Sequence, residues 1–186
     1  MAIHLKAPVD QELLNTLKAG DEVLISGTIY TGRDAAHKRM MEMIERGEPL
    51  PFNIRGQIIY YVGPCPAPPG KIIGSAGPTT SGRMDAYTPR LIEMGLKGMI
   101  GKGARSKEVI AAIKQYGAVY FGATGGAAAL IASCIKKAEV IAFEDLGTEA
   151  IRKLEVENIP CTVIIDTKGN DVYITGRARY ERKGRV

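Results

Sequence analysis

The sequence predicts an α/β domain with a mostly parallel central sheet and extra strands toward the C-terminus. Between residues 22 and 137, short apolar segments typical of strands alternate with segments that have helical periodicity. Such alternation is typical of a parallel sheet in which helices connect successive strands. Residues 139–174 differ, because their apolar segments follow one another as strands, with a hairpin-like turn at residues 166–170.

The composition is that of an ordinary globular protein. The chain has 186 residues, of which 45% are hydrophobic and 24% are charged. This length is sufficient for a substantial core, and we expect residues 1–186 to form a single domain. Its apolar segments are shorter than the ~20 residues of a membrane span, and the first residues lack the apolar core of a signal peptide. We therefore expect a cytoplasmic protein with no membrane partner.

Local signals place the individual elements along the chain. Leucines at helical spacing predict a short opening helix, and Asp34 and Ser106 are suitable N-caps for two later helices. Pro89 can begin a helical turn. The expected strands lie at residues 22–26, 57–62, 71–74, 98–101, 118–121, 139–143, 151–156, 162–166 and 171–174, and the expected helices at residues 13–17, 34–46, 84–94, 107–113 and 124–137.

A loop rich in glycine and hydroxyl residues, at residues 74–82, is the first candidate for a binding site. It joins an expected strand to an expected helix, the geometry in which backbone N–H groups can hold an anion. Thr79, Thr80 and Ser81 add hydroxyls, and Arg83 adds a charged fork suited to a carboxylate. The same pattern is also typical of a turn whose hydroxyls cap a helix, so both interpretations stay open. The loop lacks the Gly-x4-Gly-Lys-Ser/Thr pattern of a P-loop.

Two further cations are expected near this loop. Lys102 follows the expected strand at residues 98–101, and loops at the carboxyl ends of parallel strands gather at one edge of the sheet. Arg33 precedes the expected helix at Asp34, where an arginine and a helix N-terminus can address one anion. An ordinary surface arginine is the alternative for Arg33. His37 is expected to be a packing or surface residue that could support Arg33.

The cysteines do not predict a metal site on this chain. Cys65, Cys134 and Cys161 show no paired spacing, which argues against a disulfide framework. Three cysteines could in principle ligate an iron–sulfur cluster with one open iron. Cys134 and Cys161, however, lie in apolar segments typical of core thiols. The role of Cys65, in a proline-rich loop, stays open.

The net charge of +5 is concentrated near the C-terminus. Such a basic tail can bind nucleic acid or an acidic surface, but it more often is solvated or contacts another subunit. With three Phe, no Trp and no RNA-binding signature, the sequence argues against a nucleic-acid partner. The basic residues of the tail are Arg177, Arg179, Arg182, Lys183 and Arg185.

One motif is far more specific than these patterns. The segment Gly77-Pro-Thr-Thr-Ser-Gly-Arg-Met-Asp85 resembles the motif of the β subunit, or C-terminal domain, of class I (iron–sulfur) fumarate hydratases and the related L-tartrate dehydratases. Further matches follow the order of that family and span nearly the whole chain. They are Gly27-Thr-Ile-Tyr-Thr-Gly-Arg-Asp-Ala-Ala-His37, Tyr61-Val-Gly-Pro-Cys65, Gly101-Lys-Gly103 and Asp166-Thr-Lys-Gly-Asn170.

The resemblance implies a fold, a reaction and a partner. The fold would be a swivelling β/β/α domain, and the reaction the reversible hydration of fumarate to (S)-malate. A [4Fe-4S] cluster would be held by a partner α subunit, in an α2β2 heterotetramer. By its motif, the resemblance implies that Thr79 removes the C3 proton and that Arg33, Arg83 and Lys102 hold the carboxylates. We also expect Thr80 to bind the substrate, and Thr80, Ser81 or Asp85 could orient Thr79.

Other functions remain open at this point. L(+)-Tartrate is also a C4 dicarboxylate, and the same cations would serve it. Asp85 is expected to pair with Arg83. The competing classes are a carboxylate- or nucleic-acid-binding protein that acts alone, and a purely structural subunit.

Overall fold

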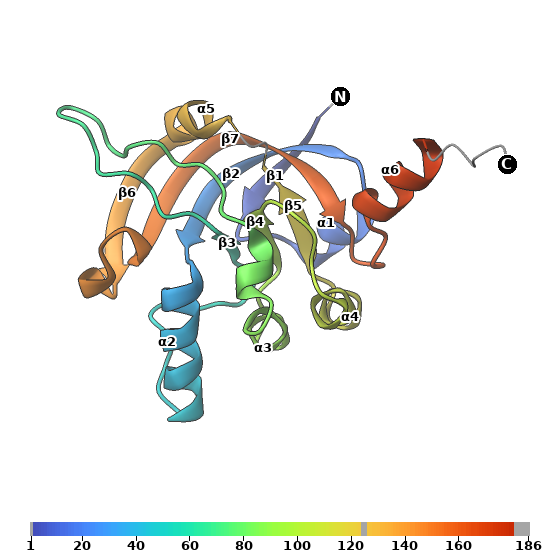
Figure 1. Cartoon of the computed structure of the whole chain (residues 1–186), viewed down its shortest axis with the longest axis horizontal. Coiled ribbons are helices and arrows are strands. Elements are labelled where there is room, and N and C mark those ends of the chain that lie inside the picture. The colour runs from blue at the N-terminus through green and yellow to red at the C-terminus, as the bar shows by residue number, and fades with distance from the viewer. Residues whose placement is uncertain (1, 124–125, 181–186) are drawn as a thin grey trace, which may run out of the picture.

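The computed structural model describes residues 2–123 and 126–180, with the backbone alone for residues 177–180 (Figure 1). Its elements are, in chain order, β1 (Ile3–Ala7), α1 (Gln11–Thr16), β2 (Glu22–Thr31), α2 (Asp34–Glu45), β3 (Ile58–Tyr60), the 3-10 helix η1 (Ser81–Met84), α3 (Thr88–Glu93), β4 (Gly98–Gly101), α4 (Lys107–Tyr116), β5 (Val119–Gly122), α5 (Ala128–Cys134), β6 (Ile135–Ala142), the 3-10 helix η2 (Glu144–Glu149), β7 (Ile151–Ile165) and α6 (Val172–Tyr180).

The strands form one closed, mixed sheet. β2, β3, β4 and β5 are neighbours in that order and run parallel to one another. β7 closes the ring, because it pairs antiparallel with both β5 and β2. β1 adds a parallel strand beside β2, and β6 an antiparallel strand beside β7. The α/β class is confirmed, while the antiparallel pairing of β7 makes the sheet mixed.

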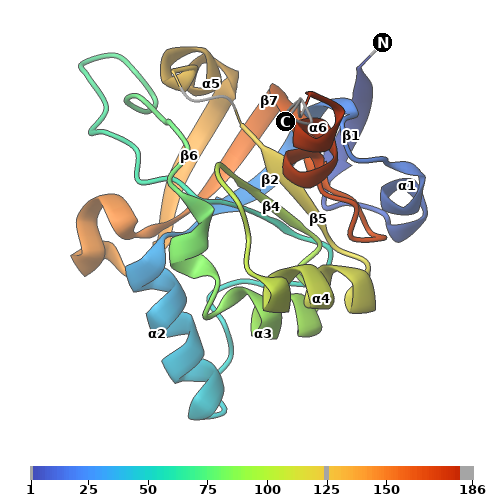
Figure 2. The same cartoon turned by 45° about the vertical axis from the view of Figure 1, so that its right-hand side comes forward.

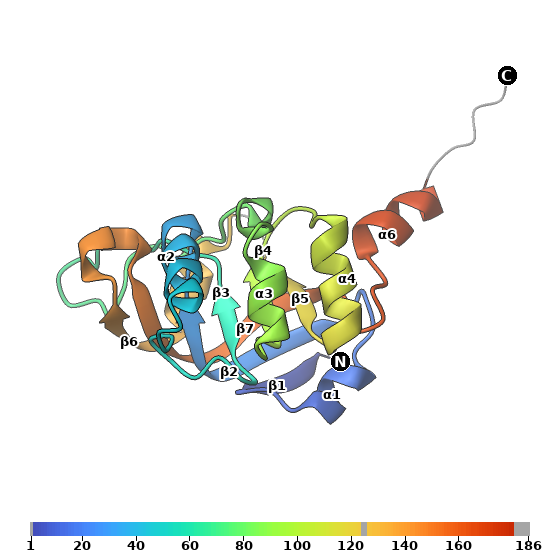
Figure 3. The same ribbon diagram turned by 90° about the horizontal axis from the view of Figure 1, so that it is seen from below.

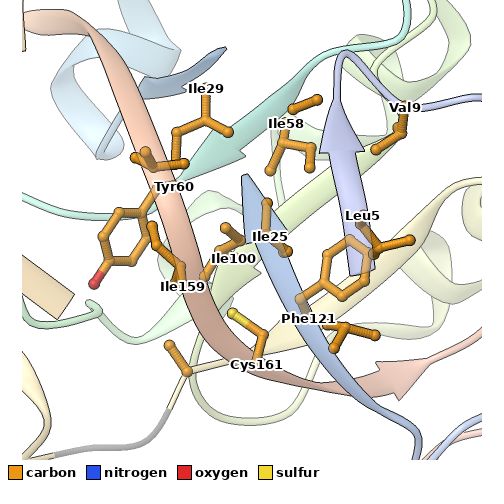
Figure 4. Packing of buried hydrophobic residues seen from close by; sticks show 14 of the residues in the cluster. Leu5, Val9, Ile25, Ile29, Ile58, Tyr60, Ile100, Phe121, Ile159 and Cys161 are labelled. Carbon is orange, nitrogen blue, oxygen red and sulfur yellow. The ribbon is translucent and has the colours of Figure 1, made fainter. Parts of the chain in front are cut away.

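Two layers of apolar side chains hold the sheet. Helices α2, α3 and α4 lie side by side on one outer face (Figure 3), where they cover outward residues such as Ile59 and Tyr120. Because side chains alternate along a strand, the neighbouring residues point inward. The inner cluster (Figure 4) includes Leu5, Ile25, Ile58, Tyr60, Ile100, Phe121 and Ile159, all 0–1% exposed.

The helices are short, and two of them begin with the cap or proline that the sequence predicts. Across residues 2–123 and 126–180, no helix combines the length and apolar character needed to cross a membrane. α4 begins as expected, with the Ser106 hydroxyl accepting the Val109 N–H. Pro89 lies in the first turn of α3, also as expected.

The strand expected at residues 71–74 is wrong. These residues belong to a long irregular loop between β3 and η1, which extends beside β6 and α5 (Figure 2). Its two arms approach closely, since the Cys65 N–H donates to the Ser75 carbonyl and the Gly74 N–H to the Cys65 carbonyl. A Cβ on Gly74 would lie 2.5 Å from the Cys65 carbonyl oxygen. The helix expected at residues 84–94 is also interrupted, by a turn between η1 and α3.

The C-terminal part differs most from the sequence prediction. α5 ends at Cys134 and β6 begins at once, so the helix does not reach Lys137; Thr124 and Gly125, expected to open it, lie outside the described residues. The two strands expected at residues 151–166 are one strand, β7.

The strand expected at residues 171–174 is wrong, because this segment begins α6. The turn before it is present, with the Asp166 Oδ1 accepting the N–H groups of Lys168 and Asn170. Asp171 then caps the helix, since its Oδ1 accepts the Tyr173 N–H at 2.8 Å. The turn therefore joins a strand to a helix rather than two strands.

Gly101, at the end of β4, provides a test of this packing. A Cβ there would lie 2.0 Å from the Ser81 Oγ and 3.0 Å from a Tyr61 ring carbon. We expect Gly101→Ala to lower the free energy of unfolding by about 1–3 kcal/mol, because buried Ser81 must move. Denaturant unfolding measures this change. Gly176→Ala is the control, since its Cβ would meet nothing nearer than 3.8 Å. Equal stability of Gly101→Ala and wild type would contradict the packing.

Candidate active site

The hydroxyl-rich loop is anchored where β3 and β4 end. The Thr79 N–H donates to the Tyr61 carbonyl at 2.7 Å, directly after β3. Thr80 forms an isolated parallel bridge with Lys102, directly after β4. The Ser81 N–H donates to the Lys102 carbonyl at 2.8 Å. The structure therefore brings Thr80 and Lys102 side by side, as expected from the parallel strands, while their role in binding stays a prediction.

Ser81 differs from its two threonine neighbours. Its side chain is buried, and its hydroxyl shares a hydrogen bond of 2.8 Å with the Tyr120 hydroxyl. Tyr120 in turn donates to the Gly103 carbonyl. The Ser81 hydroxyl thus belongs to the core of the protein, whereas its neighbours Thr79 and Thr80 are not among the buried residues.

The two arginines meet at one carboxylate. The Arg83 Nη2 donates to the Asp34 Oδ2 at 2.5 Å, and the Arg33 Nε lies 3.9 Å from the Asp34 Oδ1. The Arg33 Nη2 is also 3.3 Å from a Glu149 carboxylate oxygen. Arg33, with extended backbone, is the N-cap of α2, and Asp34 is its first residue. The expected N-cap role of Asp34 is therefore wrong, because its carboxylate turns to the arginines.

This contact is weak enough to be exchanged. The Arg83 side chain is 50% exposed and that of Asp34 is 31% exposed. Exposed ion pairs contribute about 0–1 kcal/mol, because water and salt screen them. Within the described residues, the Arg33 Nε is buried without a hydrogen-bond partner. The geometry thus provides a position at which a carboxylate contacts one guanidinium and lies close to a second.

Gly63 makes room for Arg33 beside the hydroxyl loop. A Cβ on Gly63 would lie 2.7 Å from the Arg33 Nη1 and 3.0 Å from its Cδ. Gly63 follows Tyr61 by two residues, so Arg33 lies against the segment that anchors Thr79. This close approach explains the glycine in the Tyr61-Val-Gly-Pro-Cys65 motif.

His37 supports Arg33 from the buried side of α2. Its Nδ1–H donates to the Arg33 carbonyl at 2.8 Å, which assigns the proton to that nitrogen. Its ring packs edge-on against Tyr61, with centroids 5.4 Å apart. Burial lowers the pKa of His37 to about 4. The ring is therefore neutral near pH 7 and packs beneath the site, as the sequence allowed.

A buried arginine below the site is absent from the sequence prediction. The Arg105 Nε donates to the Asp85 Oδ1 at 2.7 Å, and its Nη2 donates to the Thr88 Oγ1 at 2.9 Å. Asp85 thus pairs with Arg105, and its expected pairing with Arg83 is wrong. Arg83 instead reaches Asp34, on another helix. Local spacing could not reveal this choice, because both arginines follow glycine-rich turns.

The three cysteines lie in different environments. Cys65 is exposed, Cys134 is half-buried and Cys161 is buried. Burial raises the pKa of the Cys161 thiol to about 12, and the Cys134 thiol donates to the Asn158 carbonyl. Within residues 2–123 and 126–180, no three His, Cys, Asp or Glu side chains gather as a metal site.

His37 predicts a specific pH dependence of stability. The histidine of an unfolded chain has a pKa near 6.5, whereas folded His37 has a pKa of about 4. Between these values the unfolded state binds the proton more readily, so stability is lost as the pH falls. His37 contributes a loss of about 3 kcal/mol over this interval.

We expect His37→Gln to show a shallower loss of unfolding free energy between pH 7 and pH 4 than the wild type. Denaturant unfolding at several pH values measures the two slopes. His4→Gln, at an exposed histidine, is the matched control. Parallel slopes for wild type and His37→Gln would show that the buried ring is not neutral in the folded protein.

Comparison with known proteins places the chain in a family. Residues 1–176 match the family model described as fumarase C-terminus. The chain is 42% identical to fumarate hydratase 2 of Leishmania major over 175 residues, 92% of this chain and 31% of that protein. It is 41% identical to the aerobic class I fumarate hydratase of Escherichia coli K12, with 92% of this chain and 32% of that protein covered.

A shorter relative matches over most of its length. A protein assigned as L(+)-tartrate dehydratase subunit beta in Methanocaldococcus jannaschii is 40% identical over 163 residues, 84% of each chain. The chain thus spans about a third of the fumarate hydratases it matches and most of this subunit. On the family match and these similarities, the chain belongs to the fumarase C-terminus family.

Proposed function

We propose that the chain is the β subunit of an iron–sulfur-dependent hydro-lyase that interconverts fumarate and (S)-malate in the cytoplasm. Its family and its fumarate hydratase relatives support the reaction class. The observation on which the binding role depends is the approach of Arg33 and Arg83 to one carboxylate, that of Asp34. A C4 dicarboxylate can supply such a carboxylate in place of Asp34.

The proposed substrate contacts follow from charge. Arg83 would exchange Asp34 for one substrate carboxylate, since arginine–carboxylate hydrogen bonds are strong and directional. Lys102 and Thr80, joined in one bridge, would contact the substrate from the end of β4. Loss of a proton beside a carboxylate builds negative charge, and fixed cations stabilise that charge in the transition state.

Thr79 is the proposed acceptor of the C3 proton. Its backbone is fixed by the Tyr61 carbonyl, so its position is set by the end of β3. A threonine hydroxyl is a weak base at neutral pH, and the proposal requires that nearby cations favour its alkoxide. The proton would pass from C3 to the Thr79 oxygen, and the cations would stabilise the charge left on the substrate.

A [4Fe-4S] cluster does not fit the cysteines of this chain. Cys65 lies in the exposed loop, whereas Cys161 lies in the interior of the sheet, and the described residues form no metal-binding group with them. We therefore propose that a partner α subunit holds the cluster, in an α2β2 heterotetramer. The separate β-subunit relative and the partial coverage of the longer fumarate hydratases support a partner of this kind.

The docking of that partner gives the fold its proposed mechanical role. We propose that the closed sheet is a swivelling domain that presents the ends of β3 and β4 to the α subunit. The support is that Thr79, Thr80 and Lys102 all lie at these ends. The substrate would then be enclosed between the two subunits.

A tartrate dehydratase is the second candidate. The relative from Methanocaldococcus jannaschii favours it, because that protein matches this chain over 84% of both lengths. Tartrate carries the same two carboxylates, so the cations of this chain would bind either substrate.

Anaerobic hydratase assays with malate and with L(+)-tartrate separate these candidates. We expect activity with malate when the chain is combined with a cluster-loaded α subunit, and none with the chain alone. A preference for tartrate would assign the second candidate. A loaded complex inert to both substrates would contradict the hydro-lyase proposal, and tight ligand binding by the isolated chain would favour a protein that acts alone.

Arg83→Met tests the binding role within that complex. We expect hydratase kcat/KM to fall by about 10²-fold or more, because the variant loses a charge that positions and stabilises the substrate. Arg90→Met is the matched control, since Arg90 is an exposed arginine paired with Glu93 on α3. Wild-type activity in Arg83→Met would instead indicate a purely structural subunit.

A further inference from the structure

Arg105 is a buried charged side chain, and burial of a charge costs free energy because the charge loses its water. Its side chain is 0% exposed, and it lies in the loop between Lys102 and α4. Buried ion pairs are often no more stabilising than apolar residues of the same volume, because both charges lose water. The pair of Arg105 with Asp85 therefore calls for a reason other than stability alone.

Arg105 contacts residues next to three proposed site residues, Thr79, Arg83 and Lys102. Through Asp85 and Thr88 it holds the segment that follows Arg83. Its Nη2 also lies 3.4 Å from the hydroxyl of Tyr61, whose carbonyl anchors Thr79. Arg105 itself belongs to the loop that begins with Lys102. One guanidinium thus connects the surroundings of Thr79, Arg83 and Lys102.

Further hydrogen bonds join the same two segments. At one end, the Ser81 N–H donates to the Lys102 carbonyl at 2.8 Å. At the other end, the Asp85 carboxylate accepts both the Arg105 Nε–H and the Ser106 N–H, the latter at 2.6 Å. The segments 81–88 and 102–106 are therefore joined at two points. A shift of Lys102 relative to Arg83 requires at least one of these hydrogen bonds to break.

The contacts depend on the shape of the guanidinium as well as its charge. Its central carbon lies 4.9 Å from the ring centroid of Tyr120 and 5.3 Å from that of Tyr61. Planar guanidinium groups suit such aromatic faces, and their fork reaches two acceptors at once. A lysine supplies one compact charge and cannot reproduce this set of contacts.

We propose that Arg105, held by Asp85, is a positioning residue that sets the spacing between Lys102 and Arg83 for the hydratase reaction. The inference rests on the proposed function. Arg105 contacts no substrate and acts through the two loops. Displacement of a catalytic group by about 1 Å can cost about 10²-fold in rate.

Arg105→Lys in the assembled, cluster-loaded enzyme is the first test. We expect kcat to fall by about 10²-fold while KM changes by less than about fivefold. Every substrate-binding cation is retained, so ground-state binding persists, whereas the alignment needed in the transition state is lost. The assay is run well below the melting temperature of the variant and normalised to assembled complex. Arg90→Met is again the control and keeps both constants.

Amide hydrogen exchange on the same chain separates positioning from a general loss of stability. We expect Arg105→Lys to speed exchange at Ser81 and Ser106, whose N–H groups bond across the two segments. The Ala118 N–H, bonded to the Ile113 carbonyl after α4, is the internal reference and stays protected. A uniform rise at all three amides would overturn the proposal, because it indicates global destabilisation.

Thr88→Val supplies a second variant in case Arg105→Lys does not fold. It removes the Nη2 acceptor at Thr88 and leaves the contact with Asp85 in place. We expect a smaller loss of kcat, about 10-fold, again with little change in KM. The role of Arg105 is overturned if both variants keep the wild-type kcat. If Arg105→Lys does not fold, a wild-type kcat in Thr88→Val alone overturns it. An inert wild-type complex, or an active Arg83→Met complex, instead overturns the proposed function.

Discussion

The antiparallel pairing of β7 closes the sheet and thereby fixes where the strands β3 and β4 end. This strand of 15 residues pairs with β2 along one edge and with β6 and β5 along the other. It closes four parallel strands into a ring, which removes the open edges that β2 and β5 would otherwise expose. Because β3 and β4 are adjacent and parallel within this ring, their carboxyl ends lie together. The hydroxyl loop and Lys102 meet there for this reason.

Two arginine–carboxylate pairs of different depth then shape the proposed site. Arg83 and Asp34 form a half-exposed contact that another carboxylate can replace. The Arg105 side chain is 0% exposed and that of Asp85 is 15% exposed, so loss of Asp85 would leave a buried guanidinium without its partner charge. The outer pair suits reversible binding and the inner pair suits permanent positioning. An arginine–carboxylate pair thus serves two purposes in this protein, because burial raises the free-energy cost of separating the two charges.

Caps and apolar segments in the sequence predicted those helices and strands whose ends depend on neighbouring residues. Ser106 caps α4 and β4 follows its apolar segment, because a cap and an apolar run need no distant partner. Ile72 and Ile73 are apolar but lie in a loop, whose two arms are joined by hydrogen bonds between Cys65 and residues 74 and 75. Asp34 pairs with Arg83, and Asp85 pairs with Arg105. Both pairs join residues far apart in the sequence, so spacing could not predict which arginine each carboxylate contacts. The candidate cations came from their positions at the ends of expected strands and helices, and the closed sheet explains why Thr80 and Lys102 are neighbours.

A crystal structure of the assembled enzyme with malate bound would show whether the substrate takes the place of Asp34. We expect a malate carboxylate to bond to Arg83 in the place of Asp34, with Arg33 and Lys102 within contact distance of the substrate. We also expect Arg105 and Asp85 to keep their contact in the complex. Malate bound away from these three cations, with the Arg83–Asp34 contact intact, would contradict the proposed binding.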